Sequence, residues 1–452
     1  MRGEILRLAW PLYIGQLAVM VNGIIDTAMA GRLSAQDLAA VGLGSSVYVS
    51  VYVSLMGVLL ALSPIAAQHL GAGRRAEVGA AFWQAVWVAL ALSVPGCIAL
   101  GWSQPWIALA DAPAELAGRI DAYLGYTAAG IPAALLFRCF YALNTAIAQP
   151  KVVMAINLIG VAAKFPLNLL FMHGSEMLGL PALGGPGCAL ATSVIAWASV
   201  IGAAAWLWRD PRYNGLALRR PVAPRARAMA ELLRLGLPIG ATYLIEVTSF
   251  TFMSILVARF GTVTLASHQI AANLTGVIYM IAMAIASATS TLVAQSLGAG
   301  DLARARVLAL TGIRLGVALA VLAGALLWLL RAPIAQAYST DPSVVAAALP
   351  LLAALAVFSV FDSLQTQIAF VLRAYKIATL PMVVCVVSMW GVGLGGGWLL
   401  TVAGEPAALG AAALHGSRSG ALGFWLAGVI GLVVASAGLA LVIRRVWRMP
   451  AA

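Results

Sequence analysis

The chain has 452 residues, of which 62% are hydrophobic and only 9% are charged. A water-soluble protein of this length needs a polar surface that this composition cannot supply, so the sequence indicates a protein that crosses a membrane many times. Lys and Arg outnumber Asp and Glu by 27 to 15, giving a net charge of +12, which raises the question of whether the basic residues form a binding patch.

Twelve apolar stretches are long enough to cross a bilayer about 30 Å thick, which takes about 20 helical residues. In chain order they span residues 8–30, 41–65, 80–100, 123–148, 152–172, 187–208, 235–257, 266–293, 307–330, 344–372, 379–400 and 421–442. The sequence therefore predicts an all-α membrane protein with twelve transmembrane helices.

The basic residues follow this topology and do not form a patch. If both termini lie in the cytoplasm, 19 of the 27 Lys and Arg residues fall in cytoplasmic segments. An excess of basic residues in alternate loops is the positive-inside rule, which sets orientation and does not indicate a polyanionic ligand. We therefore expect a multi-pass protein of the cell (inner) membrane, surrounded by lipid, with both termini cytoplasmic and no nucleic acid partner.

Cysteine and histidine usage argues against resident metals and cofactors. The four cysteines and four histidines are scattered, without the paired spacing of a disulfide framework or a zinc site. An intramembrane enzyme would need a His or Ser beside a buried carboxylate at the same depth as its acid–base partner, and no histidine is expected near a midplane acid. We expect no cofactor and no enzymatic activity.

The two halves of the chain are related by an internal repeat. A shift of 227 residues aligns Pro11 with Pro238 and superimposes the sequence AQHLGAG of residues 67–73 on AQSLGAG of residues 294–300. In both halves, the Gly-Ala-Gly is predicted to end a helix at the cytoplasmic face.

The repeat predicts the domain organisation. Two halves with an even number of helices have the same orientation, and in transporters of this kind the substrate path lies between the halves. We expect an N-terminal six-helix bundle, a basic cytoplasmic linker and a C-terminal six-helix bundle, at residues 1–208, 209–230 and 231–452.

Six ionisable residues fall inside the predicted helices, where a charge at the bilayer centre costs on the order of 3 kcal/mol. They are Asp26, Arg138, Lys164, Glu246, Arg314 and Asp362. A helical rise of about 1.5 Å per residue places Glu246 and Lys164 at about 18 Å and Asp362 at about 15 Å from the inner face, near the midplane. The same rise places Asp26 farther out, at about 27 Å. The two arginines have long side chains that reach water or a carbonyl, which favours structural roles.

The three buried acids have polar neighbours at helical spacing. These neighbours are Asn22, Thr242, Ser249, Ser359, Ser363 and Thr366. A carboxylate among hydroxyl and carbonyl oxygens can hold Na⁺ or carry a proton. We therefore predict that Asp26, Glu246 and Asp362 bind a coupling cation, with Glu246 and Asp362 as a Na⁺ site.

Lys164 leaves two interpretations open. In the first, it takes part in the function of the N-terminal half, in a polar stripe with Asn168, which lies nearer the expected depth of Asp26. Alternatively, Lys164 forms an ion pair with Asp26 that holds two helices together. No basic residue of the second half is expected at the depth of its two acids, and Arg373 is counted among the cytoplasmic basic residues.

Several motifs resemble one known family. They are the run DTAMAGRLSAQDLAAVGLG from residue 26, the paired AQHLGAG and AQSLGAG, and LASHQIAANL from residue 265. Together with the duplicated six-helix halves, they resemble the multidrug and toxic compound extrusion (MATE) transporters over essentially the whole chain, and the acids in helices one, seven and ten resemble the NorM-like branch. The resemblance implies a V-shaped pair of six-helix bundles that exports small lipophilic cations in exchange for Na⁺ or H⁺, with no other cofactor.

The resemblance also implies roles for individual residues. Glu246 and Asp362 match the acids of the C-half cation site, and Asp26 with Asn168 matches the N-half polar cluster. Relatives tend to have Asn-x-Pro-x-Asn in helix five, whereas this chain has Lys164 at the first position. A lysine there would compete with any cation in the N-terminal half and shift substrate choice towards less cationic or even acidic molecules.

For such a transporter, we expect polar, apolar and aromatic side chains to line the substrate cavity. The candidates are Asn22, Lys164, Asn168, Tyr243, Ser249, Phe250, Met253, Phe358, Phe361 and Thr366. A packing or lipid-facing role is an equal alternative for any one of the apolar residues among them. We expect a monomer.

A flippase of lipid-linked oligosaccharides on a related fold is the alternative function. Such a protein handles a large anionic headgroup and should line its cavity with several basic side chains. Only Lys164 and Arg138 are available for that role.

Overall fold

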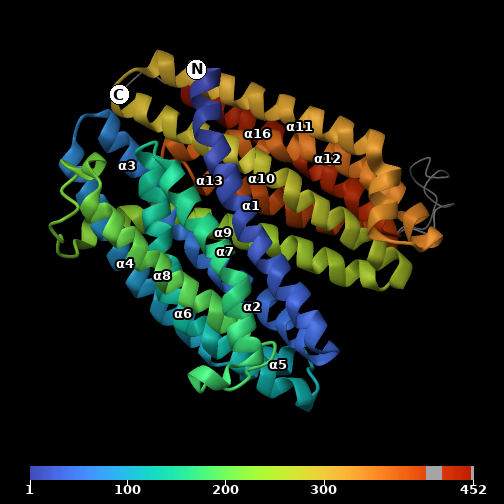
Figure 1. Ribbon diagram of the computed structural model, residues 1–452. Helices are drawn as coiled ribbons and strands as arrows, with labels where there is room; N and C mark the ends of the chain where they lie inside the picture. Colours follow the sequence, from blue (N-terminus) through green and yellow to red (C-terminus); the bar gives the residue numbers. More distant parts are fainter. Residues whose placement is uncertain (404–419, 449–452) are drawn as a thin grey trace. The chain divides into compact units, whose positions relative to one another are not determined.

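The computed structural model describes residues 1–403 and 420–448, and these residues are almost entirely helical (Figure 1). Within these ranges, twelve helical segments are long and apolar enough to cross a membrane. The predicted all-α fold class and the number of membrane-spanning helices are therefore confirmed.

The helices of the first half are α1 (Arg2–Leu33), α2 (Ala35–Leu59), α3 (Leu62–Gly71), α4 (Arg75–Gly101), α5 (Gln104–Leu109), α6 (Ala114–Ala146), α7 (Pro150–His173) and α8 (Gly187–Arg209). Those of the second half are α9 (Ala226–Ala258), α10 (Thr262–Gly298), α11 (Leu302–Tyr338), α12 (Pro342–Ala374), α13 (Thr379–Cys385), α14 (Gly396–Trp398) and α16 (Gly420–Arg448). Most helices are longer than the apolar stretch from which they were predicted. The polar turns at their ends continue the helical hydrogen bonding into the membrane–water interface.

Two predicted helices are irregular. The stretch 41–65 is divided between α2 and α3, and Pro64 in the first turn of α3 has no N–H to continue the α-helical ladder. After α13, the chain runs as a π-helix over Val386–Gly395 and again over Leu399–Ala403. Pro166 lies inside α7, and the helix continues on both sides of it.

Both Gly-Ala-Gly sequences end a helix, as predicted. Helix α3 ends at Gly71 and α10 at Gly298. The second glycine of each sequence, Gly73 or Gly300, has a φ of +73° or +77°. This left-handed conformation closes helix C-termini and is strained for residues with a Cβ.

The first glycine of each sequence lies where two backbones cross. A Cβ on Gly71 would come within 1.9 Å of the Gln295 carbonyl oxygen, and a Cβ on Gly298 within 2.0 Å of the Gln68 carbonyl oxygen. The shift of 227 residues that aligns the halves converts one contact into the other. The repeated motif therefore has a packing reason, because only a residue without a side chain permits this approach.

The chain folds into two compact units. The N-terminal unit comprises residues 10–240 and 294–300, and the C-terminal unit comprises residues 1–9, 241–293 and 301–452. In the N-terminal unit, α6 packs against α2, α4 and α8, and in the C-terminal unit α12 packs between α11 and α16 (Figure 1). The division at residues 209–230 stays a prediction.

The basic segment after α8 is held against the N-terminal unit. Trp83, Gln84 and Trp87 of α4 donate hydrogen bonds of 2.9–3.0 Å to the carbonyls of Leu218, Ala223 and Val222, respectively. Burial raises the pKa of Tyr213 to about 12, and its hydroxyl donates to Asn144 Oδ1 at 2.7 Å. The arginines of the segment stay exposed, so its backbone is fixed while its charges face outwards.

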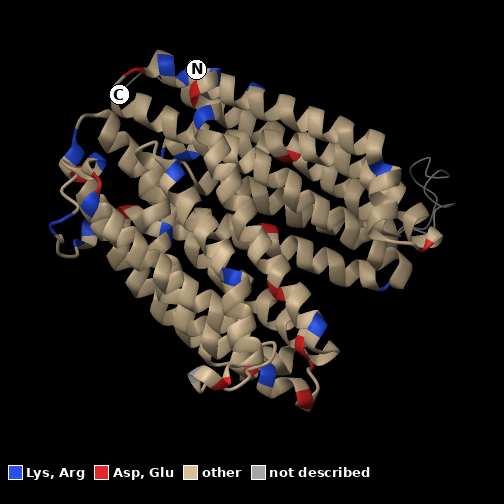
Figure 2. Cartoon of the chain, viewed as in Figure 1, with Lys and Arg blue, Asp and Glu red and all other residues tan. Residues whose placement is uncertain are grey.

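Charged residues lie mostly at helix ends and in loops, and the long helices carry few of them along their middle parts (Figure 2). This distribution suits helices whose central turns lie in hydrocarbon. The few charged residues within the helices are therefore the natural candidates for function.

Candidate functional site

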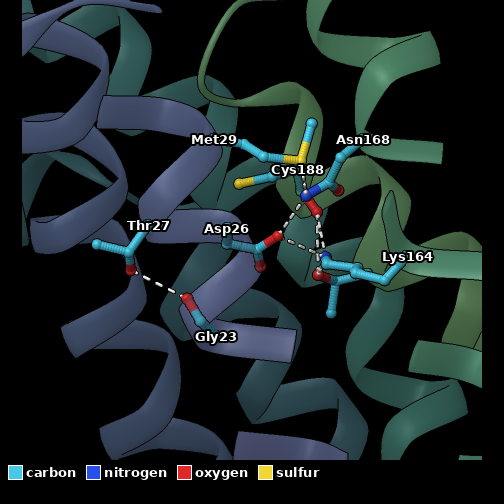
Figure 3. Close-up of polar contacts among 8 residues, drawn as sticks. Gly23, Asp26, Thr27, Met29, Lys164, Asn168 and Cys188 are labelled. Atoms are coloured by element: carbon cyan, nitrogen blue, oxygen red, sulfur yellow. Dashed lines mark hydrogen bonds and ion pairs between the residues drawn. The ribbon is translucent and has the colours of Figure 1, made fainter. Parts of the chain in front are cut away.

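The acid of α1 is neutralised inside the N-terminal unit. Lys164 Nζ lies 2.9 Å from Asp26 Oδ1, and Asn168 Nδ2 donates to the same oxygen at 2.8 Å. Lys164 and Asn168 are four residues apart on α7, so both side chains reach Asp26 from one helix face (Figure 3). Asn168 and Lys164 therefore contact the carboxylate at the same time, and the ion pair between Lys164 and Asp26 is present.

The Lys164 ammonium has no donor to spare. It also bonds to the Cys188 carbonyl at 3.0 Å and to the Thr192 hydroxyl, so its three protons match three acceptors (Figure 3). The side chain is only 1% exposed. The long lysine side chain spans the difference in depth expected between the Cα atoms of Lys164 and Asp26. Asn22, one turn before Asp26, is partly buried.

The two acids of the C-terminal unit are arranged differently. Glu246 of α9 and Asp362 of α12 are close enough to interact electrostatically, and Tyr279 of α10 lies within hydrogen-bonding range of Glu246. In the described part of the chain, neither carboxylate has a Lys or Arg nitrogen within ion-pair distance. Their polar neighbours Thr242, Ser249, Ser359, Ser363 and Thr366 are buried, as expected for one polar face on each helix.

Arg373 corrects the expectation that no basic residue lies near these acids. Its side chain is buried, with the guanidinium 4.3 Å from the Phe370 ring centroid and 5.4 Å from that of Tyr243. From there it attracts Glu246 electrostatically. The residue belongs to the last turn of α12, but its long side chain and two aromatic faces place the charge inside the protein. The predicted cavity residue Tyr243 therefore contacts Arg373.

Four predicted cavity residues line one pocket of the C-terminal unit. Ser249, Phe250, Met253 and Phe358 surround it together with Met389, Gly393, Leu394, Phe424, Trp425, Gly428 and Leu432. Ser249 is one turn from Glu246 on α9, so the pocket adjoins the acidic pair. Phe361 packs instead at the edge of the apolar core, and Thr366 is buried elsewhere on α12.

Trp425 is one of the pocket residues that the sequence did not reveal. Its ring centroid lies 5.4 Å from that of Phe358 and 6.5 Å from that of Phe250. Its indole N–H donates to His268 Nδ1 at 3.3 Å, and Ser254 Oγ is 3.0 Å from His268 Nε2. An indole can only donate, so Nδ1 accepts and the imidazole is neutral in this arrangement. The histidine of LASHQIAANL thus fixes Trp425, and the spacing of the motif gave no signal of that partner.

The remaining charged helix residues differ in environment. Arg138 is 9% exposed, and its guanidinium lies 4.2 Å from the Tyr141 ring centroid. Arg314 of α11 is exposed on the surface of its helix. Among residues 1–403 and 420–448, no group of three or more His, Cys, Asp or Glu could hold a metal ion. A Na⁺ at Glu246 and Asp362 would therefore take hydroxyl, carbonyl or water oxygens as its other ligands.

A family model described as MatE matches the chain twice, over residues 11–170 and 238–399. The two matches begin 227 residues apart, which is the shift that aligns the two halves.

Relatives cover almost the whole chain. It is 39% identical to the probable multidrug resistance protein NorM of Aromatoleum aromaticum over 99% of this chain and 95% of the relative. It is 35% identical to the multidrug resistance protein MdtK of Pectobacterium atrosepticum over 98% of this chain and 95% of the relative.

Solved structures share the fold. The eukaryotic MATE transporter AtDTX14 matches 98% of this chain and 95% of its own, with a TM-score of 0.84 and 18% identity. An outward-facing multidrug resistance MATE family transporter matches 98% and 96%, with a TM-score of 0.86 and 19% identity. The expectation of a multi-pass membrane transporter, and not of an enzyme, is thus confirmed. The double family match and the near full-length relatives together show that the chain belongs to the MatE family, in its NorM-like branch.

Proposed function

We propose that the chain is a multidrug efflux antiporter, which exports small lipophilic and mostly cationic compounds in exchange for Na⁺ or H⁺ by alternating access. The relatives named as multidrug resistance proteins support the export of drugs. Both termini face the cytoplasm in this proposal, as the basic loops favour.

The observation that carries the proposal is the charge balance of the acidic pair. Glu246 and Asp362 act on each other electrostatically, and Arg373 attracts Glu246 without closing an ion pair. When both carboxylates are ionised, they and the guanidinium leave one net negative charge within the membrane-spanning helices. One Na⁺ or one proton would balance it, and the hydroxyl of Tyr279 supplies a further oxygen.

The adjoining apolar pocket supports coupling between cation and drug. Its aromatic and methionine side chains offer adaptable surfaces for lipophilic rings. Ser249, the only hydroxyl side chain among the lining residues that the structure describes, lies on the face of α9 that carries Glu246. A cationic drug in this pocket would be attracted to the same carboxylates as the coupling ion. Each ligand would therefore lower the affinity for the other, as linkage requires.

In this proposal, Asp26 does not take a free cation while Lys164 is in place. The ammonium already supplies the positive charge, and Asn168 supplies a further hydrogen bond. The same contacts weigh against the flippase alternative, because Lys164 is held by Asp26 and Arg138 stacks on Tyr141. Neither basic side chain is then available for an anionic headgroup.

Replacing either acid of the pair should uncouple transport. In proteoliposomes, Asp362→Asn and Glu246→Gln are each expected to lower cation-driven ethidium efflux by at least about 10-fold, because the net negative charge is lost. Uptake of ²²Na⁺ and the luminal pH, followed during substrate counterflow, would identify the coupling ion.

The matched control is Asp341→Asn. Asp341 caps the exposed start of α12 by accepting from the Ser343 N–H, and asparagine caps helices equally well. The control should therefore transport normally. Export by Asp362→Asn that keeps its full dependence on Na⁺ or pH would overturn the proposal.

A further inference from the structure

A seam of glycines brings α10, α11 and α12 close together inside the C-terminal unit. Along α11, Gly312 packs on Thr289 of α10, and Gly316 packs on Gln367 of α12. A Cβ on either glycine would come within 2.4 Å of the facing side chain. Because these two positions of α11 carry no side chain, the polar groups of α10 and α12 have room in the seam.

Three buried oxygens in this region have no hydrogen-bonding partner among the residues that the structure describes. They are Ser363 Oγ, Gln367 Oε1 and Thr289 Oγ1, on side chains that are at most 1% exposed. The orientation of the Gln367 amide is fixed, because its nitrogen donates to the Ala282 carbonyl at 2.9 Å and a carbonyl can only accept. A buried polar atom without a partner destabilises the fold, so three together point to a polar occupant.

The three oxygens lie in a row that begins at Asp362. A small cavity beside Asp362 is lined by Ser359, Ser363, Gly316 and Ala282. Gln367 contacts the same Gly316 and Ala282 and lies one turn after Ser363 on α12. Thr289 of α10 follows against Gly312, which lies one turn before Gly316 and so nearer the start of α11.

This row of oxygens leads from Asp362 towards the end of the unit where α12 and α10 finish and α11 begins. The loops at that end carry the basic residues that the positive-inside rule assigns to the cytoplasm. An antiporter that takes up a cation from outside must release it on this side.

We propose that Ser363, Gln367 and Thr289 line the path by which the coupling cation leaves Asp362 for the cytoplasm. This proposal rests on the function proposed above. The path offers neutral hydroxyl and amide oxygens, which replace part of the hydration shell of Na⁺ or carry a proton through bridging water. Neutral ligands hold a cation more weakly than a carboxylate, and release requires weak sites after a strong one.

The test separates release from binding. Gln367→Leu and Thr289→Val remove the oxygens with little change in volume, and each is expected to slow cation-coupled turnover in proteoliposomes about 10-fold, a barrier increase of about 1.4 kcal/mol. Equilibrium binding of ²²Na⁺, or proton uptake at equilibrium, should stay within twofold of the parent protein, because Asp362 and Glu246 are untouched.

Thr291→Val is the matched control. Thr291 is also buried on α10, but its hydroxyl donates to the Ser287 carbonyl of its own helix at 3.0 Å. This variant should turn over normally, so a loss shared by Thr289→Val and Thr291→Val would overturn the path. If Gln367→Leu folds poorly, Ser363→Ala, which only removes an oxygen, replaces it in the test. Normal turnover in both Ser363→Ala and Thr289→Val would also overturn the proposed path.

Asp362→Asn in the same assay distinguishes the two proposals. If it abolishes coupling while Gln367→Leu and Thr289→Val turn over normally, the path is wrong and the antiport function stands. If coupling survives in Asp362→Asn, both proposals fail.

Discussion

Replacing Lys164 with methionine is expected to destabilise the protein by about 3–5 kcal/mol, because it leaves the Asp26 carboxylate buried without its counter-charge. Asp26 would keep its hydrogen bond from Asn168 but lose the ammonium at 2.9 Å. Thermal unfolding in detergent would measure the loss. The double variant Asp26→Asn, Lys164→Met removes both charges and should recover most of the stability.

The same variant tests whether Lys164 takes the place of a cation. With the ammonium gone, a proton or Na⁺ could neutralise Asp26, so Lys164→Met should be stabilised by lower pH or higher Na⁺ more than the parent protein is. A double-mutant cycle with Asp26→Asn gives the coupling energy of the pair. A coupling energy near zero would show that the two charges do not depend on each other.

Adding a methyl group to either crossing glycine is expected to have the other large effect. Gly71→Ala and Gly298→Ala would each place a Cβ about 2 Å from a backbone carbonyl oxygen, at Gln295 or Gln68. A carbonyl held in a helix cannot rotate away as a side chain can, so the overlap is relieved only by moving a helix. We expect a loss of about 3 kcal/mol for each variant.

The control for these variants is Gly42→Ala. Gly42 is an exposed residue within α2, and a Cβ there would meet nothing within 4 Å. This variant should be as stable as the parent or up to about 1 kcal/mol more stable, because alanine favours the helix. Unfolding temperatures would give the ranking. Equal stability of Gly42→Ala and Gly71→Ala would show that the crossing tolerates a side chain.

The site was only partly visible in the sequence. Asp26, Glu246 and Asp362 were found because a charge inside an apolar stretch is costly and needs a reason. Arg373 and Lys164 show the limit of that argument, since depth along a helix locates a Cα and a side chain several ångströms long carries its charge elsewhere. The role of Trp425 could not be predicted, because the sequence of an apolar helix does not show whether an aromatic residue in it faces lipid, the core or a pocket.

The sequence by itself determined the class of protein, the twelve membrane-spanning helices, the duplication and the Gly-Ala-Gly helix ends, because these depend on composition, on runs of apolar residues and on local backbone preference. Only the tertiary structure decided that Asp26 is paired with Lys164, that Arg373 attracts Glu246 beside Asp362, and that Ser363, Gln367 and Thr289 are left with unpaired oxygens in one seam. The physical reason is that a charge or a hydrogen-bonding atom is satisfied by whatever lies within a few ångströms of it. Helices far apart in the chain supply those neighbours, and the register in which two helices pack cannot be predicted from the sequence of either helix alone.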